Sequence, residues 1–218
     1  EDMQLLEETY KGFARSGALL EGKDQELYRQ YTSELAQLTL KFGQNALAAT
    51  NAFTLNITDE AKVAELPDFV KEGLAADAKA RGEQGWTVTL QAPSYSPFMT
   101  YSSQRDLKEQ LYRAYNTRGI GGETDNLENI RRIAELRLKI AQLLGYECYA
   151  DYVLEDRMAE NKATVTGFLN ELCVATLNYA HKDVKTVTEF AHSLGFEGEL
   201  MPWDWSYYSN LYKTKNYD

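Results

Sequence analysis

Histidine is a frequent ligand of catalytic metals, and this sequence contains two, His181 and His192. Both fall on one predicted helix, 11 residues apart, which is close to three full turns, so they point to one side. At 1.5 Å of rise per residue they lie ~16 Å apart, whereas each ligand of a zinc ion lies ~2 Å from it. The two side chains therefore cannot share a metal, and no H-E-x-x-H pair is present. We expect them at surface or half-buried positions.

The two cysteines, Cys148 and Cys173, are too few for a disulfide framework and have no C-x-x-C partner or adjacent base. We predict that both are buried structural thiols. The G-x-S-x-G turn of many serine hydrolases is also absent. Pairs of adjacent carboxylates are plentiful, and most of them are expected on solvated helix faces; they include Glu7-Glu8, Asp59-Glu60 and Glu155-Asp156. The sequence therefore contains no self-sufficient catalytic constellation.

Aromatic residues are the remaining chemical signal, with 15 tyrosines in the chain. Near the C-terminal end, Trp203, Trp205, Tyr207 and Tyr208 lie within six positions. Tyrosine and tryptophan combine a large apolar area with a polar tip, which suits a ligand cleft or an interface. Packing between helices explains the same residues equally well, so both interpretations stay open.

Composition narrows the class of protein. The chain has 218 residues, 44% of them hydrophobic and 26% charged, which is typical of a globular protein and excludes a disordered chain. Lys and Arg number 23 and Asp and Glu 33, so the net charge is −10 and general nucleic-acid binding is disfavoured. No apolar run approaches 18 residues, so no membrane-spanning helix is predicted, and no N-terminal signal segment is visible. The two unpaired cysteines favour a cytoplasmic location.

The apolar spacing predicts a mainly α fold, a multi-helix array with one or two short β-strands. A continuous stripe from Leu27 to Ala49 predicts a long helix from Asp24, its N-cap, to Thr50. Other helices are predicted over about 67–81, 103–115, 125–145, 149–158 and 161–194, with a shorter one before Gly17. Ser103 and Asp106 resemble a capping box, and Asn161 is a predicted N-cap.

Strict alternation predicts strands at 53–57 and 86–91, which can pair as a small hairpin on the helical body. The segment 92–97 contains two prolines and is predicted to be a stiff, extended connector. Because it also shows the only convincing change in composition, 92–97 is the one possible sub-boundary within residues 1–218.

Several segments, taken in order along almost the entire chain, resemble the thimet oligopeptidase family of zinc metallopeptidases, and especially its bacterial dipeptidyl carboxypeptidase and oligopeptidase A branch. No single segment is strongly specific, but their order and spacing are. They are FARSGA (13–18), FGQN (42–45), WTVTLQAPSY (86–95), PFM (97–99), LKEQLYRAY (107–115), TRG (117–119), LLGY (143–146), MA (158–159), PWD (202–204) and YY (207–208).

The resemblance implies a helical fold with a deep channel, which admits short peptides and excludes folded proteins. It also implies one zinc, held by an H-E-x-x-H helix and a later glutamate, with the motif glutamate as general base. In the family that helix follows the tryptophan-aspartate-tyrosine segment, and this chain ends before any such helix. No catalytic or metal-ligand role can therefore be carried over to its residues. The candidates for the substrate channel are Tyr95, Trp203, Asp204, Tyr207 and Tyr208.

The chain is therefore interpreted as a non-catalytic, helical fragment of a larger peptidase, since it starts at Glu1 rather than Met and stops at Asp218. The fragment is expected to be inactive, to bind no catalytic zinc and to self-associate through exposed apolar surface. Two alternatives are a stand-alone helical peptide-binding or scaffold module, and an enzyme that completes its site across a homodimer. Endo-oligopeptidase and dipeptidyl carboxypeptidase action are not separated, and a periplasmic location stays an alternative.

Overall fold

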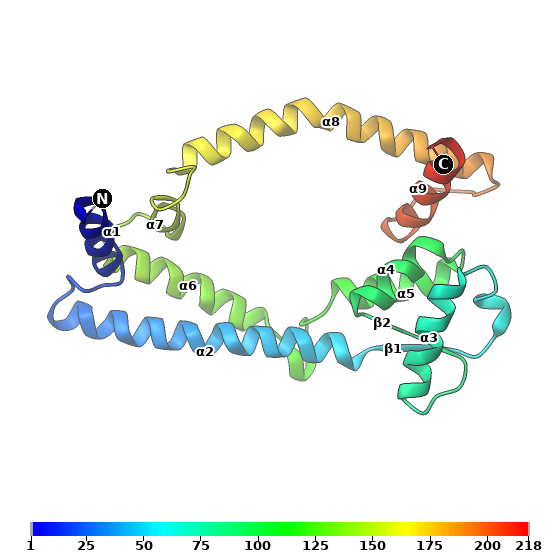
Figure 1. Cartoon of the computed structure of the whole chain (residues 1–218), viewed down its shortest axis with the longest axis horizontal. Coiled ribbons are helices and arrows are strands. Elements are labelled where there is room, and N and C mark those ends of the chain that lie inside the picture. The colour runs from blue at the N-terminus through cyan, green and yellow to red at the C-terminus, as the bar shows by residue number, and fades with distance from the viewer. Residues whose placement is uncertain (1, 218) are drawn as a thin grey trace. The chain divides into compact units, whose positions relative to one another are not determined.

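The structure is a computed structural model that describes residues 2–217 (Figure 1). The chain divides into two compact units. Unit 1 contains the residues up to Gln44 together with Asp125–Val174, and unit 2 contains Asn45–Thr124 together with the residues from Ala175 onward. Glu1 and Asp218, on which the expectation about the chain ends rests, lie outside the described residues.

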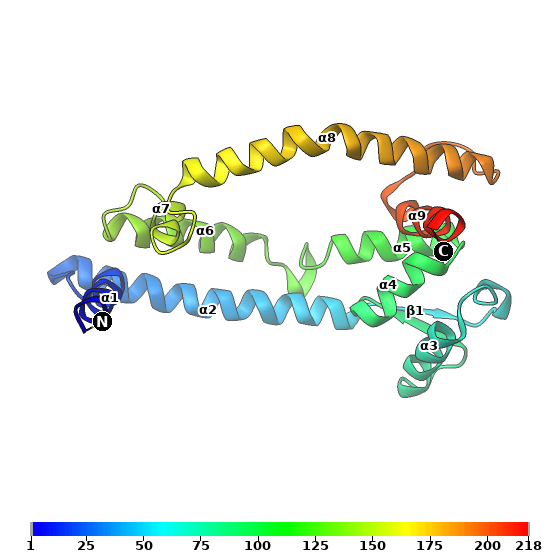
Figure 2. The same ribbon diagram turned by 45° about the horizontal axis from the view of Figure 1, so that its top comes forward.

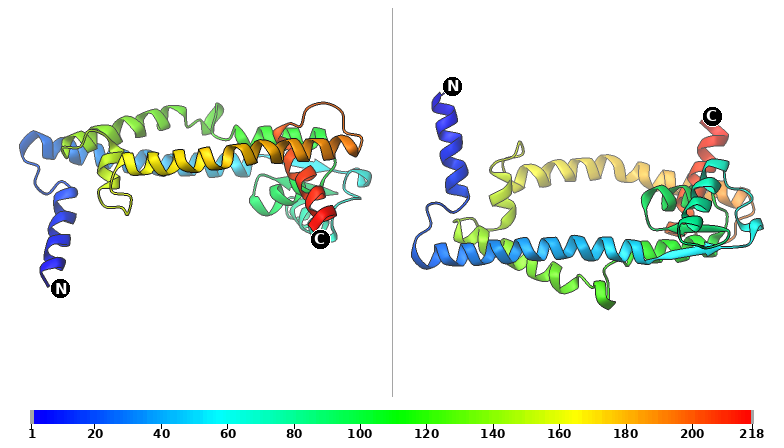
Figure 3. Two further views of the ribbon diagram at one scale, coloured as in Figure 1. Left: turned by 90° about the horizontal axis from the view of Figure 1, so that it is seen from above. Right: turned by 60° about the horizontal axis from the view of Figure 1, so that its bottom comes forward.

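Unit 1 is helical, and its elements are α1 (Asp2–Arg15), the first part of α2 (Gly22–Ala52), α6 (Leu127–Leu143), α7 (Tyr149–Leu154) and the first part of α8 (Lys162–Ser193). Helix α6 runs alongside the first part of α2 (Figures 2 and 3). Two nitrogens of Arg132 on α6 donate to the two carboxylate oxygens of Glu34 on α2, at 2.6 and 2.7 Å. Such a bidentate pair fixes both the position and the orientation of the two helices.

Unit 2 contains a two-stranded antiparallel sheet and the helices that cover it; its elements are β1 (Thr54–Ile57), the 3₁₀ turn η1 (Glu60–Lys62), α3 (Asp68–Ala80), β2 (Trp86–Thr89), α4 (Ala92–Tyr101), α5 (Arg105–Asn116), the 3₁₀ turn η2 (Gly122–Thr124) and α9 (Pro202–Tyr217), with the end parts of α2 and α8. In the sheet Leu55 lies opposite Val88. Helices α3 and α4 pack against β2, and α9 packs against α4 and α5. The hairpin on a helical body is confirmed.

The main hydrophobic core lies in unit 2 and joins the sheet, α3, α4, α5 and α9. Its buried members are Ile57, Val63, Leu66, Val70, Leu74, Val88, Leu90, Phe98, Met99, Leu111 and Trp203. Because Trp203 belongs to this cluster, the start of α9 is held by the same core as the sheet. The mainly α fold with two short strands is also confirmed.

The predicted connector at 92–97 was wrong, because these residues form most of α4. Pro93 lies in the first helical turn, where its missing N–H would have no partner within the helix. Pro97 lies inside the helix, which tolerates the loss of one backbone bond. The whole segment lies within unit 2.

The predicted capping box at Ser103 was also wrong. Helix α5 begins at Arg105, and the N–H and hydroxyl of Ser103 both donate to Glu65, at 2.6 and 2.7 Å. The predicted N-cap at Asn161 is confirmed, since its side-chain oxygen accepts a bond from the N–H of Thr164 at 2.9 Å.

Across residues 2–217, no helix has both the length and the apolar character that crossing a membrane requires.

Candidate functional site

All five channel candidates from the sequence lie in unit 2. Tyr95 is on α4, and Trp203, Asp204, Tyr207 and Tyr208 occupy the first two turns of α9. Trp203 and Asp204 are buried, whereas the three tyrosines are half-buried. The structure therefore divides the candidates into two groups, one that packs inside the unit and one that reaches the surface.

Asp204 is 1% exposed and is held by two elements. The Nε of Arg105 on α5 donates to both of its carboxylate oxygens, at 3.0 and 3.2 Å, and Nη2 donates at 3.0 Å. The backbone N–H of Met201 adds a bond of 2.9 Å. This arrangement raises the pKa of Arg105 and satisfies a carboxylate that would otherwise be buried without partners. Asp204 therefore anchors the start of α9 rather than offering a free acid or base.

Trp203 is 5% exposed and lies among cations and a second ring. The guanidinium groups of Arg113 and Arg105 lie 5.1 and 5.8 Å from its ring centre, and the Tyr112 ring lies at 5.8 Å. Its indole Nε1 is the one buried side-chain polar atom within residues 2–217 that has no hydrogen-bond partner. The ring thus contributes packing and cation–π attraction to the core.

Lys108 on α5 is 1% exposed, which is unusual for a lysine. Its ammonium lies 4.5 Å from the ring centre of Tyr207. Burial lowers the pKa of Lys108 to about 8, although Asp204 and Glu65 act in the opposite direction. The sequence offered no sign of this residue, because a single lysine in a helix usually faces solvent.

The hydroxyls of Tyr207 and Tyr208 are two polar groups of this region that remain available. Neither is bonded to another residue of the described chain, and neither is among its buried polar atoms without a partner, so both reach solvent. Their rings pack edge to face at 5.1 Å, and burial raises both pKa values. Tyr95 stacks on Tyr115 at 4.3 Å, and burial raises its pKa also.

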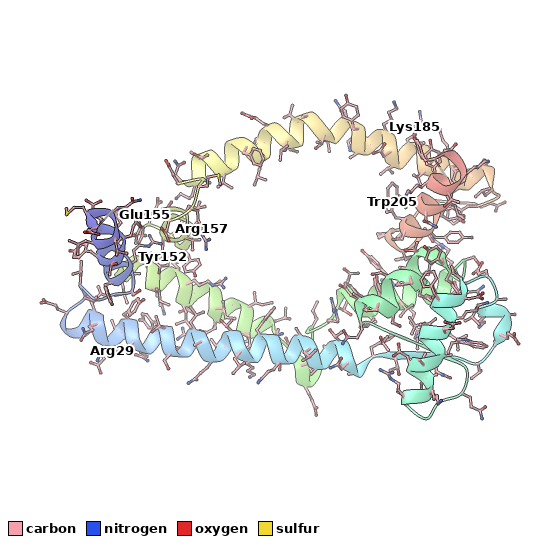
Figure 4. All side chains as sticks on the ribbon, in the orientation of Figure 1. Arg29, Tyr152, Glu155, Arg157, Lys185 and Trp205 are labelled. Atoms are coloured by element: carbon pink, nitrogen blue, oxygen red, sulfur yellow. The ribbon has the colours of Figure 1, made fainter. Side chains whose placement is uncertain are left out.

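A second feature of unit 2 is a groove between the end part of α8 and α9, which we call the α8–α9 groove. It encloses about 500 Å³ and is lined by Tyr179, Lys182, Asp183, Thr186, Val187, Trp205, Ser209, Tyr212 and Tyr217. Figure 4 labels Trp205 on α9 and Lys185 on α8. Sequence reasoning missed the groove, although the lining residues recur at helical spacing on both helices.

In unit 1, Arg15 joins α1 to α7 and the turn that follows it. Its guanidinium donates to Glu155 at 2.5 Å and to the backbone oxygen of Tyr152 at 2.7 Å, and it lies 4.7 Å from the Tyr152 ring centre. The hydroxyl of Tyr146 also donates to Glu155. Figure 4 labels Tyr152 and Glu155 at this contact. Glu155 is exposed, in line with the expectation for such carboxylates, and it also forms an ion pair with Arg15.

The described residues do not fit a zinc ion. No group of three or more His, Cys, Asp or Glu side chains within residues 2–217 could hold a metal. Both histidines are exposed, as expected, and His192 bonds to the carbonyl oxygen of Gly198 at 2.8 Å. The prediction of buried thiols was wrong, because Cys173 is exposed and Cys148 is half-buried with its thiol donating to Asp151 at 3.2 Å.

Comparison with known proteins places the chain in a family. Residues 98–218 match the model of peptidase family M3. The chain is 36% identical to oligopeptidase A of Salmonella typhimurium over 97% of its length, and 26% identical to dipeptidyl carboxypeptidase of Escherichia coli over 100%. It is 33% identical over 99% of its length to a protein of Arabidopsis thaliana named probable cytosolic oligopeptidase A. In each case it spans 32% of the relative. The chain belongs to peptidase family M3, the thimet oligopeptidase family that its sequence resembles.

Proposed function

We propose that this chain is a non-catalytic part of a zinc-dependent metallopeptidase that hydrolyses short peptides, and that it contributes scaffold and channel wall. The observation that carries the proposal is the family match over residues 98–218, which include α9 and its exposed tyrosine hydroxyls. The names of the relatives, oligopeptidase A and dipeptidyl carboxypeptidase, support peptides as substrates. The choice between internal cleavage and release of C-terminal dipeptides is assigned to residues outside this chain.

We propose further that the chain on its own is inactive, because its described residues contain no cluster suited to zinc. The test compares the chain with the whole product of its source gene, using a quenched fluorescent peptide with and without a zinc chelator. The chain should cleave nothing, and the gene product should lose its activity in the chelator. Cleavage by the chain alone would contradict the proposal. A gene product without H-E-x-x-H would favour the stand-alone peptide-binding module.

Tyr207 and Tyr208 are the proposed wall residues, because their hydroxyls bond to no other described residue and reach solvent near the start of α9. In the active gene product, Tyr207→Phe and Tyr208→Phe should raise KM for short peptides about 3- to 10-fold and leave kcat nearly unchanged, the loss of about one hydrogen bond to the substrate. Tyr10→Phe on exposed α1 is the control. An unchanged KM in both variants would remove the two tyrosines from the channel.

Self-association of the chain is also part of the proposal. Phe168, Leu169 and Leu172 lie on one face of α8 and are 60%, 56% and 44% exposed. Exposed apolar patches of this kind usually bind a partner. Light scattering should show a mass that grows with concentration, and a triple Ser variant at these positions should lower it. A constant monomer mass at high concentration would contradict this expectation.

A cytoplasmic location is proposed as well, supported by the relative named a probable cytosolic oligopeptidase A.

A further inference from the structure

The bonding pattern of the small sheet shows which backbone groups of β1 face outward. The N–H of Thr89 on β2 donates to the hydroxyl of Ser94 at 3.0 Å, so this N–H points away from β1. In an antiparallel pair, bonded and non-bonded residue pairs alternate. Thr54 with Thr89 and Asn56 with Thr87 are therefore the non-bonded pairs. The side-chain bond of 3.0 Å from Asn56 to Thr87 agrees, because side chains approach more closely in such pairs.

The backbone N–H and C=O groups of Thr54 and Asn56 consequently lie along the outer edge of β1. Both residues are exposed, and no backbone bond to another described residue occupies this edge. The four groups span ~7 Å, at ~3.4 Å of rise per residue. Natural sheet edges are usually protected by proline, lysine or a bulge, and β1, with the sequence TLNI, has no proline or lysine. By contrast, Ser94 of α4 occupies the outer side of β2.

Charge beside this edge favours one occupant. Asp59 and Glu60 are exposed and lie two and three residues after the C-terminal end of β1. Half-buried Glu83 lies beside the same hairpin and accepts from the hydroxyl of Thr87 at 2.5 Å. The nearby cations along the chain are Lys62 and Arg81, and Arg81 is paired with Asp77, so unpaired acidic groups exceed basic ones here. A strand added antiparallel to β1 has its amino terminus at the end of β1, beside these carboxylates.

We propose that the outer edge of β1 binds a short peptide in an extended conformation, antiparallel to the strand, with the peptide's amino terminus beside Asp59 and Glu60. The inference rests on the proposed peptidase function and adds a second peptide contact that is separate from Tyr207 and Tyr208. Backbone bonds from Thr54 and Asn56 supply the affinity, as in other cases of strand addition. Because these bonds use the backbone alone, the site accepts many sequences.

The first test measures, by calorimetry, the binding of the peptide Lys-Val-Thr-Val-Thr with a free amino terminus to the whole chain. In an antiparallel strand every second residue bonds to the neighbouring strand, so the peptide amides form two alternating sets, one that faces β1 and one that faces away. N-methylation of one set at a time separates their contributions. Methylation of one set should weaken binding at least tenfold, and methylation of the other set by less than twofold. Equal effects of both sets, or no binding of the unmodified peptide, would overturn the inference.

The second test changes the protein. Thr54→Pro removes one outward N–H without removing a bond to β2, so peptide affinity should fall at least fivefold. Thr54→Val keeps that N–H and should stay within twofold of the original chain. If Thr54→Pro fails to fold, hydrogen exchange of the unchanged chain replaces it: the peptide should slow exchange at Thr54 and Asn56. Unchanged exchange at both amides would overturn the inference.

The third test addresses charge and other occupants. Acetylation of the peptide's amino terminus, or Glu60→Gln in the chain, should weaken binding two- to fivefold, and added salt should abolish the difference. Protection of Thr54 and Asn56 in a dimer without peptide would assign the edge to a second copy instead. Failure of binding by the chain, while the whole gene product still cleaves peptides, would overturn this inference and leave the proposed function intact.

Discussion

Arg105 and Asp204 are 99 positions apart in the sequence, yet the guanidinium of one donates to both carboxylate oxygens of the other, at 3.0 to 3.2 Å. The carboxylate is buried, whereas the Arg105 side chain is 44% exposed. This pair connects the first turns of α5 and α9, and the N–H of Met201 completes the set of bonds to Asp204. The start of α9 is therefore held in two ways, by this ion pair and by the apolar contact of Trp203 with the core.

Asp204→Ala should destabilise unit 2 by about 2 to 3 kcal/mol, because it removes a charge-assisted pair and the bond to Met201. Exposed Arg105 can regain water, which keeps the cost below that of a fully buried pair. Urea denaturation followed by tryptophan fluorescence measures the change. Asp183→Asn, at an exposed position of the same unit, is the control and should change stability by less than 0.5 kcal/mol, about the usual effect at a surface site. Equal effects of the two variants would contradict this role.

Lys108 should make stability rise with pH. Its pKa is about 8 in the folded chain and 10.5 when unperturbed, so between these values the unfolded state binds more protons. The cost of burying the charge is therefore complete below pH 8 and fades as pH rises towards 10.5, by at most about 3 kcal/mol. Lys108→Met should remove this rise of the unfolding free energy between pH 8 and 10, as measured by urea denaturation. Lys213→Met, at an exposed position, should leave the rise unchanged. A similar slope in all three proteins would refute this prediction.

A side chain at Gly85 should destabilise the hairpin. Its φ is +81°, and an added Cβ would collide with the backbone carbonyl oxygen of Ile57 at the end of β1. Gly82 has a similar φ of +72° but no atom within 4 Å of an added Cβ, so it is a matched control. Gly85→Ala should cost about 1 to 3 kcal/mol more than Gly82→Ala, the usual range for overpacking. Denaturant unfolding and amide exchange in the hairpin measure the difference, and equal costs would show that the hairpin yields without strain.

Arg15→Ala should release α1. This helix has no buried residue, and Arg15 supplies the bonds that hold it to Tyr152 and Glu155. Loss of a charged pair of this kind costs about 1.5 kcal/mol or more, so amides of α1 should exchange about tenfold faster. Arg29→Ala, at an exposed position on α2, is the matched control. Figure 4 labels Arg29 and the two contact residues, Tyr152 and Glu155. Unchanged exchange in α1 would show that the contact does not hold the helix.

Local pattern predicted most elements. The stripe from Leu27 to Ala49 lies within α2, and the alternation after Trp86 lies in β2. The failures occurred where a bond between separate elements decided the local structure. Ser103 bonds to Glu65 instead of capping α5, and the N–H of Thr89 bonds to Ser94 of α4, whose two prolines predicted an extended segment. A cap or connector contributes only about 1 kcal/mol, so one tertiary bond is enough to override it.

The sequence by itself determined the family, the helical class, the pairing of two short strands and the absence of H-E-x-x-H from these residues, because each follows from order or period along the chain. Only the tertiary structure decided that Asp204 is anchored by Arg105, that Lys108 is buried and that the backbone groups of Thr54 and Asn56 face away from β2. The physical reason is that burial and bonding direction depend on which distant segments pack together. Periodicity records a residue's side of its own helix or strand, but not what covers that side.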